Sequence, residues 1–288
     1  MMHNFHLFLA AATCAISVCA YYDSESVDSL YNDNEFKPRM VLEGIIPTEH
    51  SLPFVAYIAV TEGKLVKECT GSIIAPRYVL TAFHCLLTNK NKATVPQAIA
   101  VRVGSQYKSK GRKYLVSGFG TTDKTAQGSR NWDDIVILEL TQEILFDFLT
   151  TAAISLSRGT PRIGETLTIA GHGTRIVQRR FLKSDSYVIG NVTVRKSSRY
   201  CKPKGNEFCA GGLEQGTAMD DSGGPAFKII NRKYVQVGMI LGGEHFHKVD
   251  KSKRDFEPFD MYGYGNYLKI APYCEYIQRS TAGTAYCQ

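Results

Sequence analysis

The sequence predicts an all-β fold of antiparallel strands that ends in one short helix. Three observations lead to this expectation. After residue 40, short runs of β-branched, aromatic and aliphatic residues recur about every ten to twenty residues. Gly, Pro, Asn or Lys separates them, and helical periodicity appears mainly near the C-terminus. Regular short strands with turn residues between them are typical of antiparallel sandwiches or barrels.

Six runs show the strand pattern most clearly. Each is rich in residues that fit a pleated, half-buried surface. In chain order they are FVAYIAV (54–60), GSIIAPRYVLTAFHC (71–85), AIAVRVG (98–104), DIVILEL (134–140), ETLTIAG (165–171) and YVQVGMILGG (234–243).

The C-terminal segment LKIAPYCEYIQRS predicts the helix. Its apolar side chains fall at the i, i+3, i+4, i+7 positions of one helix face, and they are Ile270, Tyr273, Cys274 and Ile277. Proline is tolerated in the first turn of a helix, so we expect Pro272 to lie at the helix start.

Residues 1–20 indicate a secretory signal peptide. Residues 2–20 contain no Lys, Arg, Asp or Glu, and their apolar run ends in small residues that suit cleavage after Ala20. A membrane anchor is the alternative, but the run is short for a bilayer span of about 20 residues. We therefore expect a secreted, extracellular protein without a membrane association.

Residues 21–39 form an acidic leader. They carry five acids and two bases, a net −3, whereas the whole chain has 34 Lys+Arg and 27 Asp+Glu, a net +7. Without apolar periodicity, this stretch is expected to be solvated. It ends in Lys37, Pro38 and Arg39, a site that a trypsin-like protease can cut.

The cysteine count favours disulfides. Eight cysteines less Cys14 and Cys19 of the signal leave six, an even number that suggests three disulfides in an oxidising compartment. Spacing alone leaves their pairing open. His245 and His247 are the only weak hint of a metal site, and no zinc-type Cys/His cluster accompanies them. We therefore expect no metal and no cofactor. The six are Cys69, Cys85, Cys201, Cys209, Cys274 and Cys287.

Three short segments together provide the residues of a nucleophilic catalytic site. TAFHC contains His84, WDDIVILEL contains Asp134 at the start of an apolar run, and DDSGGP contains Ser222 in a glycine-rich turn. A serine hydroxyl is a poor nucleophile near neutral pH. A histidine must take its proton, and a buried carboxylate must orient the histidine. Each segment alone has a structural interpretation, but together they predict a Ser-His-Asp triad.

The order His, Asp, Ser on a β-rich chain resembles the chymotrypsin-like (trypsin-like) serine proteases, and more narrowly an insect chymotrypsin-like or scolexin-like member. The resemblance covers residues 40 to about 279. The segments that carry it are CTGSIIAPRYVLTAFHC, DDIVILELTQEI, TIAGHGT, NEFCAGG and YGNYLKIAPYCEYI.

The resemblance implies two antiparallel six-stranded β-barrels with a C-terminal α-helix, forming a protease domain over residues 40–288. The triad would lie in the cleft between the barrels, with Asp134 rather than Asp133 as the histidine's partner. Two disulfides are implied, Cys69–Cys85 and Cys201–Cys209. Cys274 and Cys287 are additional, and their pairing stays open.

The resemblance also implies activation of a zymogen. Cleavage of the 21–39 propeptide after Arg39 would free the α-amine of Met40. This amine would insert beside Asp221, since a buried carboxylate without a partner is costly. The backbone N–H groups of residue 220 and Ser222 would form the oxyanion hole.

The chain departs from the family pattern at several positions. Asp220 stands where the family has glycine, although Asp tolerates positive φ better than most residues. Phe83 replaces a small residue, Ala218 a cysteine, and Leu241 and Gly242 a Ser-Trp pair.

The substrate pocket would be formed by Gly216, Gly243 and Gly265. This neutral slot predicts large apolar or aromatic side chains at P1, the residue before the cleaved bond. A shifted alignment that brings Asp260 into the pocket would instead favour Arg or Lys.

The expected function is a secreted serine endopeptidase. The alternative is a weakly active or non-enzymatic homologue that acts as a binding module in a protease cascade. Expected partners are protein or peptide substrates, a trypsin-like activating protease and protein protease inhibitors, with no nucleic acid and a monomeric state. A sequon at Asn191 predicts glycosylation. The basic runs Lys108–Lys113, Arg175–Lys183 and Lys248–Arg254 are more simply separate solvated loops than a polyanion site, and the first of them argues against bound calcium.

Overall fold

The computed structural model describes residues 44–126, 132–177, 180–247 and 261–288. The predicted signal peptide, the propeptide with Arg39, and Met40 lie outside the described residues. So do Asp260 and the basic run 248–254. No helix in the described ranges is long and apolar enough to cross a membrane.

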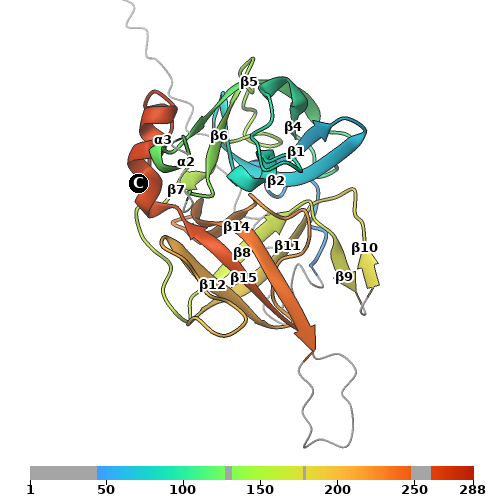
Figure 1. Ribbon diagram of the computed structural model, residues 1–288, viewed down its shortest axis with the longest axis vertical. Helices are drawn as coiled ribbons and strands as arrows, with labels where there is room; N and C mark the ends of the chain where they lie inside the picture. Colours follow the sequence, from blue (N-terminus) through green and yellow to red (C-terminus); the bar gives the residue numbers. More distant parts are fainter. Residues whose placement is uncertain (1–43, 127–131, 178–179, 248–260) are drawn as a thin grey trace, which may run out of the picture.

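Two antiparallel barrels, one above the other in Figure 1, make up the fold. The first is closed in the order β1-β2-β3-β6-β5-β4. Its strands are β1 (Val55–Glu62), β2 (Leu65–Ala75), β3 (Tyr78–Thr81), β4 (Ile99–Val103), β5 (Arg112–Thr121) and β6 (Val136–Leu140).

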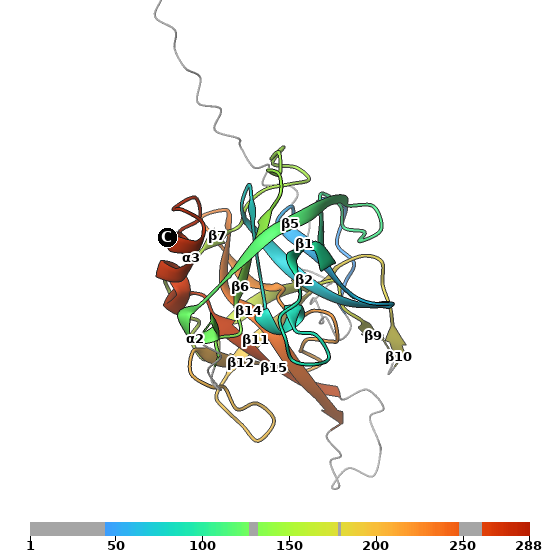
Figure 2. The same cartoon turned by 45° about the horizontal axis from the view of Figure 1, so that its top comes forward.

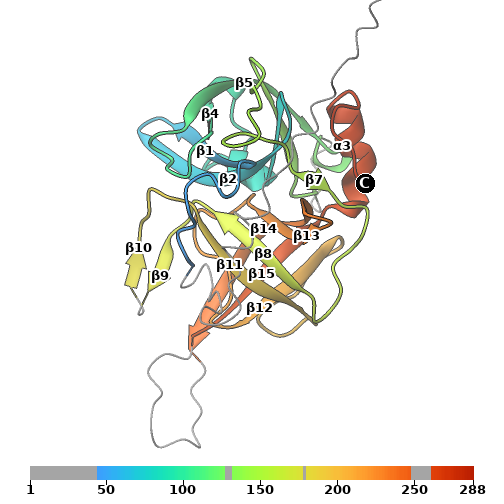
Figure 3. The ribbon, with the colours of Figure 1, turned by 180° about the vertical axis from the view of Figure 1, so that it is seen from behind.

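The second barrel runs in the order β13-β8-β11-β12-β15-β14 and closes through the β13–β14 pairing. Figure 3 shows its strands from behind. They are β8 (Thr166–Gly171), β11 (Val188–Arg195), β12 (Glu207–Leu213), β13 (Pro225–Ile230), β14 (Lys233–His247) and β15 (Met261–Lys269), and the short β7 (Ser155–Leu156) pairs in parallel with β14. The expected fold of two six-stranded barrels is confirmed.

The remaining elements lie around the barrels. Strands β9 (Arg175–Val177) and β10 (Arg180–Leu182) form a hairpin that stands apart from both of them (Figure 2). The short helices are η1 (Phe83–Leu86), η2 (Pro96–Ala98), α2 (Asp123–Ala126), η3 (Ala271–Tyr273) and α3 (Cys274–Ser280).

The predicted C-terminal helix is present as η3 followed by α3. Pro272 lies in the first turn of η3, where its missing N–H costs nothing. The four side chains of the predicted apolar face are all buried. Tyr276 from α3 also donates a hydrogen bond to the carbonyl of Gly120 in β5 (2.5 Å), which fastens the C-terminal segment to the first barrel.

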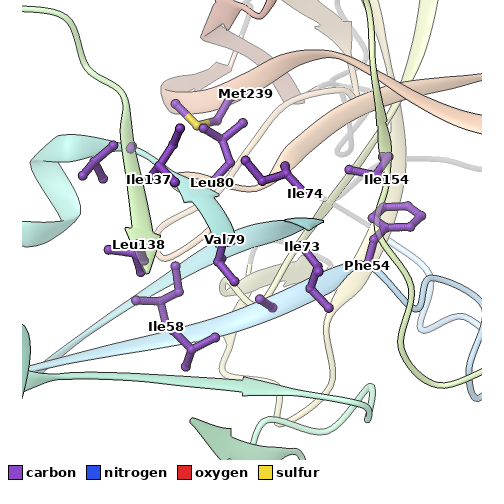
Figure 4. Close-up of a cluster of buried hydrophobic side chains, with 14 of the residues drawn as sticks. Phe54, Ile58, Ile73, Ile74, Val79, Leu80, Ile137, Leu138, Ile154 and Met239 are labelled. Carbon is purple, nitrogen blue, oxygen red and sulfur yellow. The ribbon is translucent and has the colours of Figure 1, made fainter. Parts of the chain in front are cut away.

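The hydrophobic core fills the first barrel and continues into the junction with the second. Ile58, Val79 and Leu138 from three strands meet inside the first barrel (Figure 4). Met239 of the second barrel packs in the same cluster. At the junction Ser72 Oγ donates to the side-chain oxygen of Gln236 (2.7 Å), so a buried polar pair links β2 with β14.

Three disulfides complete the framework. Cys69–Cys85 and Cys201–Cys209 form as the resemblance implied, and Cys274 pairs with Cys287. The last pairing answers the question that the sequence left open.

Candidate active site

His84 lies on the 3-10 turn η1, directly after strand β3 of the first barrel. The turn is held on both sides of the histidine. Cys85 is joined to Cys69 of β2, and the buried Phe83 packs edge-to-face on Trp132 at 5.4 Å between ring centroids. The large side chain at position 83 therefore fills space beside the turn and leaves the histidine in place.

Asp134 holds His84 through two hydrogen bonds. Its Oδ2 lies 2.7 Å from His84 Nδ1, and its Oδ1 accepts the backbone N–H of the same residue at 2.8 Å. The pair is mostly buried, with 27% of the His84 side chain and 18% of the Asp134 side chain exposed. A carboxylate in this position favours the tautomer that carries its proton on Nδ1 and leaves Nε2 free to accept a proton.

The neighbouring Asp133 has different partners. Its carboxylate accepts hydrogen bonds from Thr122 Oγ1 (3.0 Å) and from the hydroxyl of Tyr273 (2.9 Å). Asp133 thus ties the loop before β6 to the C-terminal segment, while Asp134 faces the histidine.

Ser222 lies in the loop before β13 of the second barrel, pressed against the first barrel. Its carbonyl accepts the N–H of Thr70 in β2 at 2.9 Å. The next residue, Gly223, has φ +83, and a Cβ there would come 2.0 Å from Thr81 Oγ1. Only glycine allows this close approach, which brings the serine to the junction between the barrels. The Ser222 hydroxyl donates to the carbonyl of Leu241 (3.3 Å).

Asp220 adopts the left-handed conformation, with φ +74. Its carbonyl accepts the hydroxyl of Thr70 at 3.2 Å, which helps to fix this turn. Among the described residues, neither the Asp220 N–H nor the Ser222 N–H has a hydrogen-bond acceptor. Burial raises the pKa of the Asp220 carboxyl, and the nearby Glu68 raises it further.

Asp221 is fully buried directly before the serine. Its carboxylate accepts the N–H groups of Ala218 (2.7 Å) and Gly173 (2.9 Å). A Cβ on Gly171 or Gly173 would come within 2.1 or 2.4 Å of it. Burial raises its pKa to about 7, against the lowering effect of the two N–H groups. Among the residues that the structure describes, no cationic side chain forms an ion pair with Asp221.

The three glycines expected to line the substrate pocket lie on neighbouring elements. Gly243 of β14 faces Gly265 of β15 in the strand pairing, and Gly216 lies in the loop after β12 with φ +152. The Thr217 Oγ1 atom is 2.6 Å from the position of a Cβ on Gly243. The buried hydroxyls of Thr217 and Tyr267 have no hydrogen-bond partner among the described residues.

Gly242 leaves open space at the edge of this region, because a Cβ there would meet no atom within 4 Å. Because Gly242 has no side chain, β14 covers the hollow beside Leu241, Gly242 and Gly243 only partly. This hollow measures about 500 Å³ and also reaches Asp134 and Tyr200.

A second hollow, of about 580 Å³, adjoins His84. It lies between the β1–β2 hairpin and the segment that follows η1. Sequence reasoning missed its most notable residue, Lys67, whose Nζ donates to the carbonyl of His84 at 2.6 Å. No sequence motif could have identified this lysine, since it approaches the histidine through tertiary contacts, among them the disulfide that joins Cys69 of β2 to Cys85.

The structure gives less support to the other sequence predictions. Asn191 lies in β11 and its side-chain oxygen accepts the hydroxyl of Thr168 (3.1 Å), so glycosylation stays a prediction. In the first basic run, Lys108 is paired with Glu68 at 2.6 Å. Within the described ranges no group of three or more His, Cys, Asp or Glu side chains is placed to hold a metal ion.

Comparison with known proteins gives one family and several relatives. The family model described as Trypsin matches residues 42–254. Chymotrypsin of Phaedon cochleariae is 28% identical over 233 residues, which are 75% of this chain and 78% of that protein. Hypodermin-B of Hypoderma lineatum is 28% identical over 61% of this chain and 68% of its own length. Mast cell protease 8 of Mus musculus is 24% identical over 64% and 74% of the two chains.

Proposed function

Because the chain belongs to the trypsin family of serine endopeptidases, we propose that it hydrolyses peptide bonds through Ser222, His84 and Asp134 after proteolytic activation. The observation that carries this proposal is the doubly hydrogen-bonded Asp134–His84 pair. This pair lies near the loop that contains Ser222, which is hydrogen-bonded to β2 of the first barrel. The substrates would be proteins or peptides.

In the proposed reaction, His84 Nε2 takes the proton from the Ser222 hydroxyl while the oxygen of Ser222 attacks the carbonyl carbon of the substrate. The serine hydroxyl must first turn from the carbonyl of Leu241 toward the histidine. Hydrogen bonds of this kind are often long or misaligned in an unoccupied enzyme and tighten when substrate binds. The imidazolium is stabilised by Asp134 and then gives the proton to the departing amine. This leaves the acyl group on Ser222, and a water molecule that gives its proton to His84 would then hydrolyse the ester and restore the serine hydroxyl.

The oxyanion that develops on the substrate would be bound by the N–H groups of Asp220 and Ser222. Both are without an acceptor among the described residues, which supports this role. Donors aimed at developing charge stabilise the transition state more than the substrate. Asp220 has a positive φ, a conformation that glycine adopts readily, which supports the proposal that the aspartate can replace the glycine that the family has at this position.

Activation would follow cleavage after Arg39. The new α-ammonium group of Met40 would pair with Asp221, whose buried carboxylate has no cationic partner among the described residues. A buried charge of this kind is costly until it is paired. We further propose a signal peptide over residues 1–20, secretion, and a glycan on Asn191. We expect Arg39→Gln to give a folded, inactive zymogen, whereas equal activity of this variant would contradict activation at that site.

Primary specificity would favour large apolar or aromatic side chains. The glycines at positions 216, 243 and 265 add no charge to the pocket, so a buried Arg or Lys side chain would find no counter-ion there. The unpartnered hydroxyls of Thr217 and Tyr267 would favour side chains such as tyrosine, whose own hydroxyl can pair with them. Preferred cleavage after Arg or Lys would show that this pocket assignment is wrong.

A second candidate function is a non-enzymatic protease homologue that binds partners in a cascade. The hydrogen bond of Ser222 to Leu241 and the carboxylate at position 220 favour it. A peptide library separates the two functions. The protein cleaved after Arg39 should hydrolyse apolar-P1 peptides, and Ser222→Ala should not. If the two proteins are equally inactive, the binding function is supported and the enzymatic one is overturned.

A further inference from the structure

We infer that Lys67 is a specificity-determining residue that binds an acidic side chain of the substrate on the leaving-group side of the cleaved bond. This inference rests on the proposed function, because it names the substrates that the same site prefers. It concerns the hollow beside His84, which the catalytic steps do not use.

The two hollows reach different members of the His84–Asp134 pair: one reaches Asp134 and the other reaches His84. The one at β14 is bordered by Leu241, Gly242 and Gly243, the part of this strand that would bind the substrate before the cleaved bond. The other is lined by His84 itself and by two segments of the first barrel. Because His84 delivers its proton to the departing amine, we assign the second hollow to the residues that follow the cleaved bond.

The second hollow has the size and lining of a peptide-binding site. Its volume of about 580 Å³ falls in the range of 300–1,000 Å³ that ligand sites usually occupy, roughly enough for one or two side chains. Leu65 and Val66 on its wall are 62% and 56% exposed. These apolar side chains can pack on the substrate, while the polar groups of the hollow choose among substrates.

Lys67 provides the charge of this hollow. Its Nζ uses one N–H for the carbonyl of His84 (2.6 Å), and an ammonium group has three. Burial lowers the pKa of Lys67, while the carboxylates of Asp134 and Glu62 favour its charged form. The remaining N–H groups can donate to a substrate carboxylate, and charge-assisted hydrogen bonds are the stronger kind.

The two nearby acids leave this role to Lys67. Asp134 is occupied by His84 through both of its oxygens. Glu62 lies on the wall of the hollow, where its carboxylate accepts the N–H of Asn89 at 3.1 Å. A basic substrate residue would approach the Lys67 ammonium with like charge, and Glu62, one oxygen of which is engaged by Asn89, would offset only part of that repulsion, so we expect Lys and Arg to be less favoured than Glu here.

The test compares peptides that differ at one position. The P1 residue is held fixed and apolar, and one of the first two residues after the cleaved bond is Glu, Gln or Lys. In the protein cleaved after Arg39 we expect kcat/KM to be about tenfold higher for Glu than for Gln, and lower for Lys. Lys67→Met should bring the Glu/Gln ratio close to one, and Lys67→Arg should keep it above one.

Lys64→Met is the matched control. Lys64 is exposed in the same hairpin, so its removal changes the net charge equally but does not touch the lining named above, and the Glu/Gln ratio should persist. A wild-type ratio near one, or a ratio that survives Lys67→Met, would overturn the inference. If Lys67→Met slows Glu and Gln peptides equally, Lys67 merely supports the His84 backbone and the inference also fails.

Failure of the proposed function would look different, because the wild-type protein would then cleave no peptide faster than Ser222→Ala. In that case calorimetry can measure the binding of short peptides that correspond to the residues after the cleaved bond and contain either Glu or Gln. Comparing their affinities for the wild type and for Lys67→Met still decides whether Lys67 selects the acid. Tighter binding of the Glu peptide that is lost in Lys67→Met would support the inference, and equal binding would overturn it.

Discussion

The histidine side of the site belongs to the first barrel and the serine side to the second, and the two sides differ in how completely their polar groups are paired. Asp134 uses both of its oxygens on His84. Asp221, beside the serine, is fully buried and has no cationic partner among the described residues. The first side is thus set by folding alone, whereas the second is completed by a charge from elsewhere, which we propose to be the α-amine of Met40.

The largest effect should come from breaking the histidine side. Asp134→Asn keeps the shape but favours the wrong histidine tautomer, so we expect kcat to fall by about 10⁴ with peptide substrates. Asp133→Asn is the control. Asp133 binds Tyr273 and Thr122, so this variant should lose stability more than rate. A similar loss of kcat in both variants would contradict the assignment of Asp134.

On the serine side, the carboxylate of Asp221 has no counter-ion among the described residues, and this should be visible in the pH dependence of stability. The pKa of Asp221 is raised from 3.8 to about 7 in the folded protein, so the folded state holds a proton that the unfolded state releases. The free energy of unfolding of the uncleaved protein should therefore fall as pH rises from about 4 to about 7, by about 4 kcal/mol from this group.

Urea unfolding between pH 4.5 and 7.5 measures this loss. Asp221→Asn should remove it, and cleavage after Arg39 should reduce it because the new ammonium group lowers the pKa. An identical pH slope in the wild type and Asp221→Asn would show that the carboxylate is not unpaired.

The histidine and serine sides can act together only if the two barrels keep their relative positions. The C-terminal segment links them, because β15 belongs to the second barrel and Tyr276 of α3 bonds to Gly120 of the first. The Cys274–Cys287 disulfide closes this segment over a separation of 13 residues. Changing both cysteines to serine should lower the free energy of unfolding by about 3 kcal/mol. Activity at low temperature should stay unchanged, and a lower kcat there would show that the segment also shapes the site.

The smallest effect in free energy should come from restoring glycine at position 220, two residues before Ser222. Asp220→Gly keeps the positive φ without strain and removes a negative charge beside the forming oxyanion, so we expect kcat to rise about tenfold. Glu68→Gln is a useful companion, because it removes a neighbouring charge and leaves the turn unchanged. If Asp220→Gly is slower than the wild type, the carboxylate takes part in substrate binding.

Much of the fold could be predicted because many of the strands carry a local sequence pattern. Each of the six predicted runs overlaps a strand, although the run 71–85 also includes the start of η1. The positive φ tolerated by aspartate agrees with the conformation of Asp220. The C-terminal helix followed from the spacing of its buried residues. Strands β12 and β15 were indicated only through the family resemblance of NEFCAGG and YGNYLKIAPYCEYI, since several glycines interrupt their own apolar pattern.

The details of the site depend on contacts between distant segments, which no local pattern encodes. The approach of Lys67 to the His84 carbonyl joins residues 17 apart. The buried Asp221 carboxylate fits only because Gly171 and Gly173, about 50 residues earlier in the chain, have no side chains. Sequence motifs can name candidate reacting residues, but the polar groups that surround them come from tertiary packing.

The central claim is that Ser222 becomes an activated nucleophile once the propeptide is removed. The most direct measurement is labelling with a fluorophosphonate before and after cleavage at Arg39, with the modified residue identified by mass spectrometry. We predict that Ser222 is labelled only in the cleaved protein and that His84→Ala prevents the labelling. A cleaved, folded protein that stays unlabelled, or one that is labelled at another residue, would contradict the account.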